Sequence, residues 1–245
     1  MKILITGSNG FIGRNLIERL QKEFLDLVIY KFDINNEFSD LEKFCKDCDF
    51  VFNFAAVHRP VDTSDFSKVN FNQFKFLLEC LEKYNNNCPV LYTSSIQSNN
   101  GTLYGESKFL AEQALQNHAK KTNSRGIVYR LTNIFGKWAR PNSHSVVATF
   151  CNNVQNSIPL FVSEPNKEMC FNYIDDVVDS FIARIKEGTN VLSSDFNIYS
   201  IDSRLNIHIT LQELANLIER CKEADFVPKN NIENLFYITY KSYGK

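Results

Sequence analysis

Three glycines at a spacing of three follow a short apolar segment, and this feature constrains the fold more than any other. Residues 2–6 have the length and apolar character of a buried strand. Gly7, Gly10 and Gly13 come next, and the apolar spacing then becomes helical. The start of such a helix presents free backbone N–H groups, to which a phosphate group can bind. The sequence therefore predicts a phosphate-binding turn between a strand and a helix.

A carboxylate stands at the end of the second expected strand. Asp33 lies 20 residues beyond Gly13, where an acid accepts hydrogen bonds from the adenosine ribose in dinucleotide-binding folds. A tight turn without a ligand is the alternative interpretation of the glycines alone. The acid repels a 2′-phosphate and favours NADH, whereas Lys31 and Arg14 could offset that repulsion. We therefore expect NAD(P)H as the cofactor.

Strand-like and helix-like segments alternate over the first 135 residues, which predicts a doubly wound parallel α/β fold. We expect strands at 2–6, 27–32, 50–55, 90–93 and 126–131, and helices after Gly10 and at 39–45, 67–84 and 104–122. Farther along, we expect helices at 143–156, 174–185 and 210–223, extended segments at 158–162 and 195–199, and irregular backbone over 228–245. This pattern predicts a dinucleotide-binding domain over 1–135 and a small substrate-binding lobe over 136–245, whose segments can interleave.

Charge and cysteine content narrow the class of partner. The 27 Lys and Arg against 28 Asp and Glu give a net charge of −1, too balanced for the positive field that nucleic acid or anionic lipid requires. No segment approaches the run of about 20 apolar residues that spans a bilayer. The seven cysteines include one Cys45-x-x-Cys48 pair without a second pair or a suitably spaced His. We expect ordinary reduced thiols, no metal, a cytoplasmic location and a small-molecule partner.

Tyr104 and Lys108 stand four residues apart at the head of an expected helix. This spacing places both side chains on one helix face, where an ammonium can stabilise a phenolate. A free phenol titrates near pH 10, and a neighbouring cation brings it into a range useful for acid–base catalysis. A solvent-exposed helix start is the alternative interpretation of this short motif.

These segments together resemble the extended short-chain dehydrogenase/reductase family, also known as the NAD-dependent epimerase/dehydratase family. The G-x-x-G-x-x-G turn, Phe54-Ala-Ala56, Thr93-Ser-Ser95 and Tyr104-Gly-Glu-Ser-Lys108 carry the resemblance. It implies a Rossmann-type fold and an NAD(P)-dependent oxidoreductase. It also implies that Ser95, Tyr104 and Lys108 are catalytic, and that Asn70 braces their helix. The cofactor-binding residues it implies are Gly7, Asn9, Gly10, Phe11, Ile12, Asp33, Ala55, Ala56, Tyr104 and Lys108.

A longer match narrows the substrate class. The run 133–142, Asn-Ile-Phe-Gly-Lys-Trp-Ala-Arg-Pro-Asn, is similar to the reductase half of the capsular polysaccharide enzyme CapF and its O-antigen relatives. The resemblance implies reduction of the 4-keto group of a UDP-2-acetamido-2,6-dideoxy-hexulose in capsule or O-antigen biosynthesis. Those enzymes continue into a cupin epimerase domain, which we expect to be separate, lost or removed here. A separate cupin epimerase and a second copy of this chain are the candidate protein partners. The substrate-binding residues it implies are His58, Arg59, Gln97, Asn133, Lys137, Trp138, Arg140 and Asn142.

Alternatives to this function stay open. A family epimerase or dehydratase would oxidise and re-reduce its substrate with no net cofactor turnover. A dehydratase normally adds an acid pair beside the catalytic serine, where this chain has Ile96 and Gln97. A non-catalytic dinucleotide-binding protein is the third hypothesis. For the run 137–142, a loop in which Trp138 only caps the core is the alternative interpretation.

Overall fold

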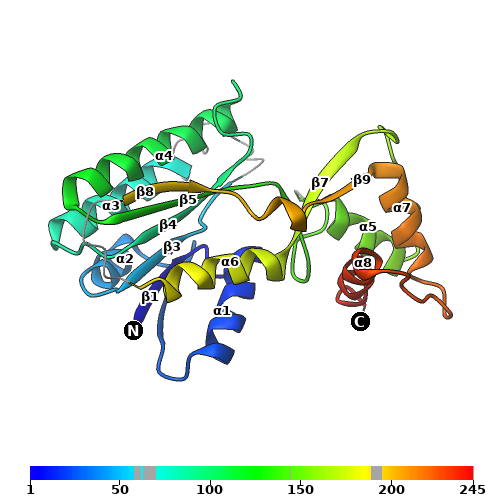
Figure 1. Cartoon of the computed structure of the whole chain (residues 1–245), viewed down its shortest axis with the longest axis horizontal. Helices are drawn as coiled ribbons and strands as arrows, with labels where there is room; N and C mark the ends of the chain where they lie inside the picture. The colour runs from blue at the N-terminus through cyan, green and yellow to red at the C-terminus, as the bar shows by residue number, and fades with distance from the viewer. Residues whose placement is uncertain (58–61, 63–69, 144, 189–194, 245) are drawn as a thin grey trace. The chain divides into compact units, whose positions relative to one another are not determined.

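The computed structural model describes residues 1–57, 62, 70–143, 145–188 and 195–244 (Figure 1). They form two compact units. The first unit comprises residues 1–131 and 178–200, and the second comprises residues 132–177 and 201–245. Among the described residues, no helix has the length and apolar character needed to span a membrane.

The first unit is built on a six-stranded parallel sheet. Its strands are β1 (Lys2–Thr6), β2 (Val28–Phe32), β3 (Phe50–Asn53), β4 (Val90–Ser95), β5 (Arg125–Leu131) and β8 (Asp195–Tyr199). Their order in the sheet is β2-β1-β3-β4-β5-β8, and all neighbours are parallel. This arrangement confirms the predicted doubly wound α/β fold. The strand order reverses between β1 and β3, the place where such sheets bind ligands beyond their carboxyl ends.

Helices cover both faces of this sheet, as Figure 1 shows. On one face lie α2 (Phe38–Cys45), α3 (Gln73–Lys83) and α4 (Leu103–Thr122), with α3 in contact with both others. On the other lie α1 (Phe11–Glu23) and the part of α6 (Ile174–Lys186) from residue 178 onward. Ion pairs Arg19–Asp179 and Lys186–Glu23, at 3.0 and 3.1 Å, join α1 to α6. The central strands β1, β3, β4 and β5 are almost wholly buried because both faces of the sheet are covered.

The last strand of this sheet, β8, comes from a segment far along the sequence. β8 pairs with β5, with Arg125 opposite Asp195 and Tyr129 opposite Tyr199. The segment 178–200 therefore returns to the sheet after the chain has entered the second unit.

The second unit combines a small sheet with helices. Its described strands β6 (Asn133–Phe135), β7 (Glu168–Tyr173) and β9 (Ile207–Thr210) lie in the order β6-β7-β9. β6 and β7 are parallel, whereas β7 and β9 are antiparallel. The helices α5 (Val146–Gln155), α7 (Leu211–Arg220) and α8 (Asn231–Lys241) pack against one another. A short 3₁₀ helix, Ser203–Leu205, precedes β9.

Two sequence-based expectations for this unit are wrong. The pattern predicts irregular backbone for 228–245, whereas α8 occupies most of that stretch. Asn230 caps α8 by accepting the backbone N–H of Glu233 at 2.9 Å, and Phe236 stacks on Phe135 with ring centres 4.4 Å apart. Residues 158–162, expected to be extended, form no strand. Aromatic packing with distant residues stabilises α8, which local periodicity does not reveal.

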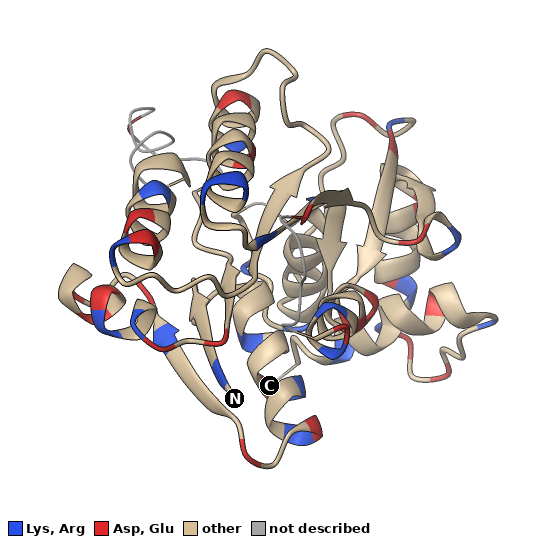
Figure 2. Ribbon diagram, turned by 60° about the vertical axis from the view of Figure 1, so that its left-hand side comes forward, with Lys and Arg blue, Asp and Glu red and all other residues tan. Residues whose placement is uncertain are grey.

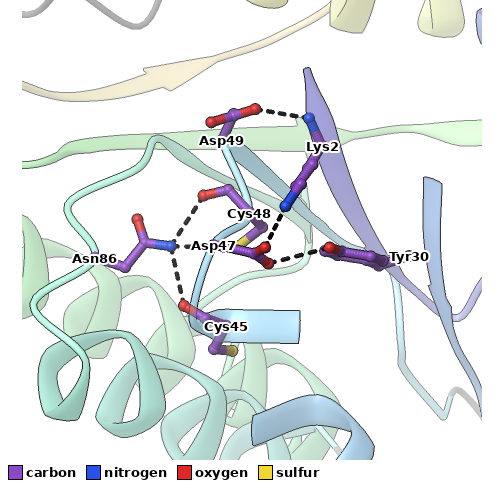
Figure 3. Close-up of polar contacts among 7 residues, drawn as sticks. All are labelled: Lys2, Tyr30, Cys45, Asp47, Cys48, Asp49 and Asn86. Atoms are coloured by element: carbon purple, nitrogen blue, oxygen red, sulfur yellow. Dashed lines mark hydrogen bonds and ion pairs between the residues drawn. The ribbon is translucent and has the colours of Figure 1, made fainter. Parts of the chain in front are cut away.

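The Cys45-x-x-Cys48 pair lies at the end of α2, within the core (Figure 3). The side-chain amide of Asn86 donates to the carbonyl oxygens of both cysteines at 2.9 Å. The sulfur atoms of Cys48 and Cys88 lie 3.8 Å apart, and burial raises the pKa of Cys45. Within the described residues, no group of three or more His, Cys, Asp or Glu is arranged to hold a metal. The pair therefore packs as part of the core.

Charges of both signs are mixed along the helices. Figure 2 shows Lys and Arg beside Asp and Glu in each unit. On α1, for example, Lys22 pairs with Glu18 at 2.9 Å. Such mixing produces no extended field of one sign.

Candidate active site

The glycine turn follows β1, and close backbone contacts require its glycines. Gly7 has φ +64°, and a Cβ there would lie 2.8 Å from the backbone nitrogen of Ala55, just beyond β3. A Cβ on Gly13 would lie 2.4 Å from the carbonyl oxygen of Gly7. Gly10 is the N-cap of α1, which has no side-chain cap and no acid in its first turn. The N–H groups at the start of α1, where Phe11 and Ile12 lie, therefore suit a phosphate.

Asp33 lies just beyond β2 and is bonded to the glycine turn. Its Oδ2 accepts the backbone N–H of Asn9 at 2.7 Å, and its Oδ1 accepts that of Ile34 at 2.9 Å. A carboxylate has about four lone-pair sites, so acceptor capacity remains for ribose hydroxyls. The structure thus brings Gly7, Asn9 and Asp33 together at the carboxyl ends of two neighbouring strands.

Ala55 and Ala56 follow β3, beside the same turn. The backbone N–H of Ala55 donates to Oγ1 of Thr6 at 3.2 Å, and that hydroxyl donates to Asn53 at 2.8 Å. These bonds hold the ends of β1 and β3 together. Both alanines are half-buried, and their small side chains suit close approach of a ligand to the backbone.

Lys108 is buried near the start of α4, and its ammonium group contacts β4. Its Nζ donates to the carbonyl oxygen of Thr93 at 2.9 Å and lies 4.9 Å from the ring centre of Tyr92 and 5.8 Å from that of Tyr104. Burial lowers the pKa of Lys108 to about 7, while the charge of Glu112 acts in the opposite direction. An amine with such a pKa can exchange a proton near neutral pH.

Tyr104 and Ser95 meet beside this lysine. Burial raises the pKa of Tyr104 to about 12, and a side-chain hydrogen bond with Ser95 partly opposes that rise. Ser95 ends β4, is 8% exposed, and accepts the backbone N–H of Gln97 at 3.1 Å through its hydroxyl oxygen. The three predicted catalytic residues therefore lie together, with a protonated phenol that can donate to a carbonyl oxygen.

Asn70 ties the segment after β3 to the catalytic helix. It accepts the backbone N–H of Val57 at 2.7 Å and donates to the Val57 carbonyl at 3.0 Å. It also donates to the hydroxyl of Ser107, in α4, at 3.2 Å. This geometry matches the bracing role that the family resemblance implies.

The second unit carries candidate substrate residues on a strained loop between β6 and α5. Trp138 has φ +72° and Asn142 has φ +56°. Positive φ is a clear outlier for a bulky side chain, and such strain clusters at binding sites. Nζ of Lys137 lies 4.3 Å from the Trp138 ring centre, and Arg140 is exposed. The structure therefore groups four of the predicted substrate residues on one loop.

Tyr243 holds this loop from the end of the chain. Its hydroxyl donates to the carbonyl oxygen of Ala139 at 2.7 Å. Asn133 precedes the loop in β6, and its side-chain amide donates to the Cys170 carbonyl at 3.1 Å. Asn133 thus also contributes to β6–β7 pairing.

The structure says less about the remaining predicted substrate-binding residues. Gln97 is exposed at the end of β4. His58 and Arg59 lie outside the described residues. Sequence reasoning missed Tyr243 and the buried Glu112, although Glu112 stands four residues after Lys108 and therefore shares its helix face.

Comparisons with known proteins show the family of the chain. The model of the NAD-dependent epimerase/dehydratase family matches residues 3–198. The chain belongs to this family. A relative from Pseudomonas aeruginosa is named UDP-2-acetamido-2,6-beta-L-arabino-hexul-4-ose reductase. It is 36% identical over 215 residues, which cover 88% of this chain and 56% of the relative. The family prediction is therefore confirmed.

Solved structures of known proteins also resemble this chain. The crystal structure of capsular polysaccharide assembling protein CapF from Staphylococcus aureus matches with a TM-score of 0.85 and 32% identity, covering all of this chain and 65% of that one. UDP-glucuronic acid 4-epimerase from Bacillus cereus, in complex with NAD, matches with a TM-score of 0.82 at 17% identity, covering 99% of this chain and 98% of that one. The second match shows a common fold. The chain thus spans less than two thirds of its reductase and CapF relatives.

Proposed function

We propose that the chain is an NAD(P)H-dependent reductase of a UDP-linked 2-acetamido-2,6-dideoxy-4-hexulose, acting in bacterial capsule or O-antigen biosynthesis. The grouping of Ser95, Tyr104 and Lys108, in the same unit as the glycine turn, carries the proposal. The similarity to a hexul-4-ose reductase supports the substrate class. We place the reaction in the cytoplasm, where the chain's free thiols would stay reduced.

The first unit has the features needed to hold a dinucleotide. Gly7 and Gly13 leave a cradle that a Cβ would fill, and the uncapped start of α1 faces that turn. Asp33 would accept hydrogen bonds from the adenosine ribose, and Lys108 would bind the nicotinamide ribose. When bound, the reduced nicotinamide supplies a hydride.

The side chains of the first unit would complete the reduction. As the hydride adds to carbon 4, the carbonyl π bond breaks and Tyr104 gives its phenolic proton to the oxygen. Ser95 would orient that oxygen, and the Lys108 ammonium would stabilise the phenolate that forms. A proton from water then restores the phenol, so each sugar converted consumes one hydride and, through Tyr104, one proton.

We propose substrate-binding roles for further side chains. Lys137, Trp138 and Arg140 would bind the uridine diphosphate by charge and stacking. The other proposed substrate residues are His58, Arg59, Gln97, Asn133 and Asn142. A separate cupin epimerase and a second copy of the chain are proposed as protein partners.

One assay separates the proposed reductase from an epimerase. Purified chain is mixed with NADH or NADPH and a UDP-2-acetamido-2,6-dideoxy-4-hexulose prepared enzymatically. We expect one equivalent of reduced-nicotinamide absorbance to disappear for each sugar converted. Sugar conversion without that loss would indicate an epimerase, because the hydride would return to its donor. Nucleotide binding without conversion of any such sugar would favour a non-catalytic protein.

A further inference from the structure

Three successive residues at the end of β4 contact three residues spaced by one turn on α4. The contacts are Ser95 with Tyr104, Thr93 with Lys108, and Ser94 with Glu112. The first two belong to the proposed catalytic group. The third contact involves Glu112, which takes no part in the proposed reaction.

Glu112 is 3% exposed, and its carboxylate binds two strands at once. Its Oε1 accepts the hydroxyl of Ser94 at 2.5 Å and Nε of Arg130 at 3.0 Å, while its Oε2 accepts Nη2 of Arg130 at 2.6 Å. Ser94 and Arg130 lie opposite each other in β4 and β5. Two parallel hydrogen bonds between a guanidinium and a carboxylate are the strong form of this contact. Glu112 therefore anchors α4 to both strands.

The charge of Glu112 also acts on Lys108, one helical turn away. Lys108 is 2% exposed, and the carboxylate of Glu112 opposes the burial that lowers the lysine's pKa. The rings of Tyr92 and Tyr104 also face Lys108, and both stay uncharged near pH 7 because burial raises their pKa. Among the residues that the structure describes, the charged groups of this neighbourhood are thus Lys108 and the Glu112–Arg130 ion pair.

We propose that Glu112 is a positioning residue for the proton-transfer pair Tyr104 and Lys108. It holds the end of β4 against α4, and its negative charge keeps the proton on that pair. This role rests on the proposed function, because the pair performs catalysis only if the chain reduces a keto sugar.

The pH dependence of reduction tests the role of this charge. The pair must be protonated for reduction, so kcat/KM falls as pH rises through the pair's apparent pKa. Glu112→Gln keeps the side chain's size and removes its charge, which makes loss of the proton easier. The basic limb of the pH profile should therefore move to lower pH by about one unit. The conservative variant Glu112→Asp retains the charge and should keep the wild-type limb.

Arg130→Gln provides the matched test of opposite sign. It removes a positive charge from the same ion pair, so the basic limb should move to higher pH. Because Arg130→Gln leaves the buried Glu112 carboxylate without its ion-pair partner, urea unfolding is used to check that this variant is folded before the two pH profiles are compared. If both variants lower the rate at every pH and leave the limb in place, Glu112 is a structural clamp alone and the proposal is overturned.

A measurement without substrate separates this inference from the proposed function. Lysine labelled with ¹³C at Cε is followed by NMR through a pH titration, with the Lys108 signal assigned from Lys108→Arg. The pKa of Lys108 should fall by about one unit in Glu112→Gln. If the pKa of Lys108 falls in this way but the chain reduces no keto sugar, the proposed reductase function is contradicted and the electrostatic role of Glu112 still holds. An unchanged Lys108 pKa in an active reductase would overturn the inference.

Discussion

The ammonium group of Lys108 donates to the carbonyl oxygen of Thr93 at 2.9 Å, which ties α4 to the end of β4. This bond fixes the position of the lysine beside Tyr104. Burial at that position removes the ammonium from water and lowers the pKa of Lys108.

Replacing Tyr104 with Phe tests the proton donor. The change removes the phenolic hydroxyl and keeps the ring, so turnover should fall by about 100- to 10,000-fold. NADH affinity, measured by fluorescence titration, should barely change. Tyr30→Phe is the control, because the Tyr30 hydroxyl bonds to Asp47 and not to the catalytic group. Near-normal turnover by Tyr104→Phe would show that another group donates the proton.

Lys108 should make stability depend on pH. Its pKa is about 7 in the folded chain, against an ordinary value of 10.5, so the unfolded chain binds more protons between these pH values. The free energy of unfolding should therefore fall as pH falls from 10.5 to about 7, and should not depend on Lys108 at lower pH, where both states are protonated. Relative to Lys108→Met, the wild-type chain should gain about 2 kcal/mol between pH 7 and pH 9, measured by urea unfolding. Parallel stability curves would contradict the lowered pKa.

Asp33 should set the preference between the two dinucleotides. Its charge repels a 2′-phosphate, so the wild-type chain should bind NADH more tightly than NADPH. Asp33→Ser removes the repulsion and should change the ratio of the two dissociation constants by about tenfold in favour of NADPH. Asp47→Ser is the control, since Asp47 pairs with Lys2 at the amino end of β1. An unchanged ratio would mean that the adenosine 2′-hydroxyl of the bound dinucleotide does not lie beside Asp33.

Tyr243 should support the loop at 137–142. Tyr243→Phe removes the hydrogen bond to Ala139 and should lower stability by about 1 kcal/mol. If the loop binds the uridine diphosphate, KM for the sugar should rise about fivefold while kcat stays close to wild type. Tyr237→Phe, on α8 six residues before Tyr243, serves as the control. A normal KM with reduced stability would mean that the loop does not contribute to substrate binding.

Much of the first unit follows from local sequence. The apolar segment before Gly7, the glycine spacing and Asp33 predict a strand, turn and helix with an acid nearby, because each feature depends on neighbouring residues. The four-residue spacing of Tyr104 and Lys108 places both on one helix face. The same rule would have found Glu112, one turn farther along.

The second unit could not be predicted as well. β6, β7 and β9 are short, and their pairing joins residues far apart in the sequence, such as Phe135 with Tyr173. The helices α5 and α7 are predicted from local sequence, whereas α8 depends on packing between Phe236 and Phe135. Short elements stabilised by distant aromatic contacts leave little local pattern.

Local sequence pattern predicted the doubly wound fold, because periodicity and spacing act over a few residues, and motif resemblance predicted the family and the residue types of the candidate site. Long-range packing, which local pattern does not contain, makes β8 complete the sheet, bonds Lys108 to Thr93 and lets Glu112 join Ser94 to Arg130. Burial and hydrogen bonding between separate strands and helices produce these relationships. They determine how a buried lysine is charged, and therefore what the site can do.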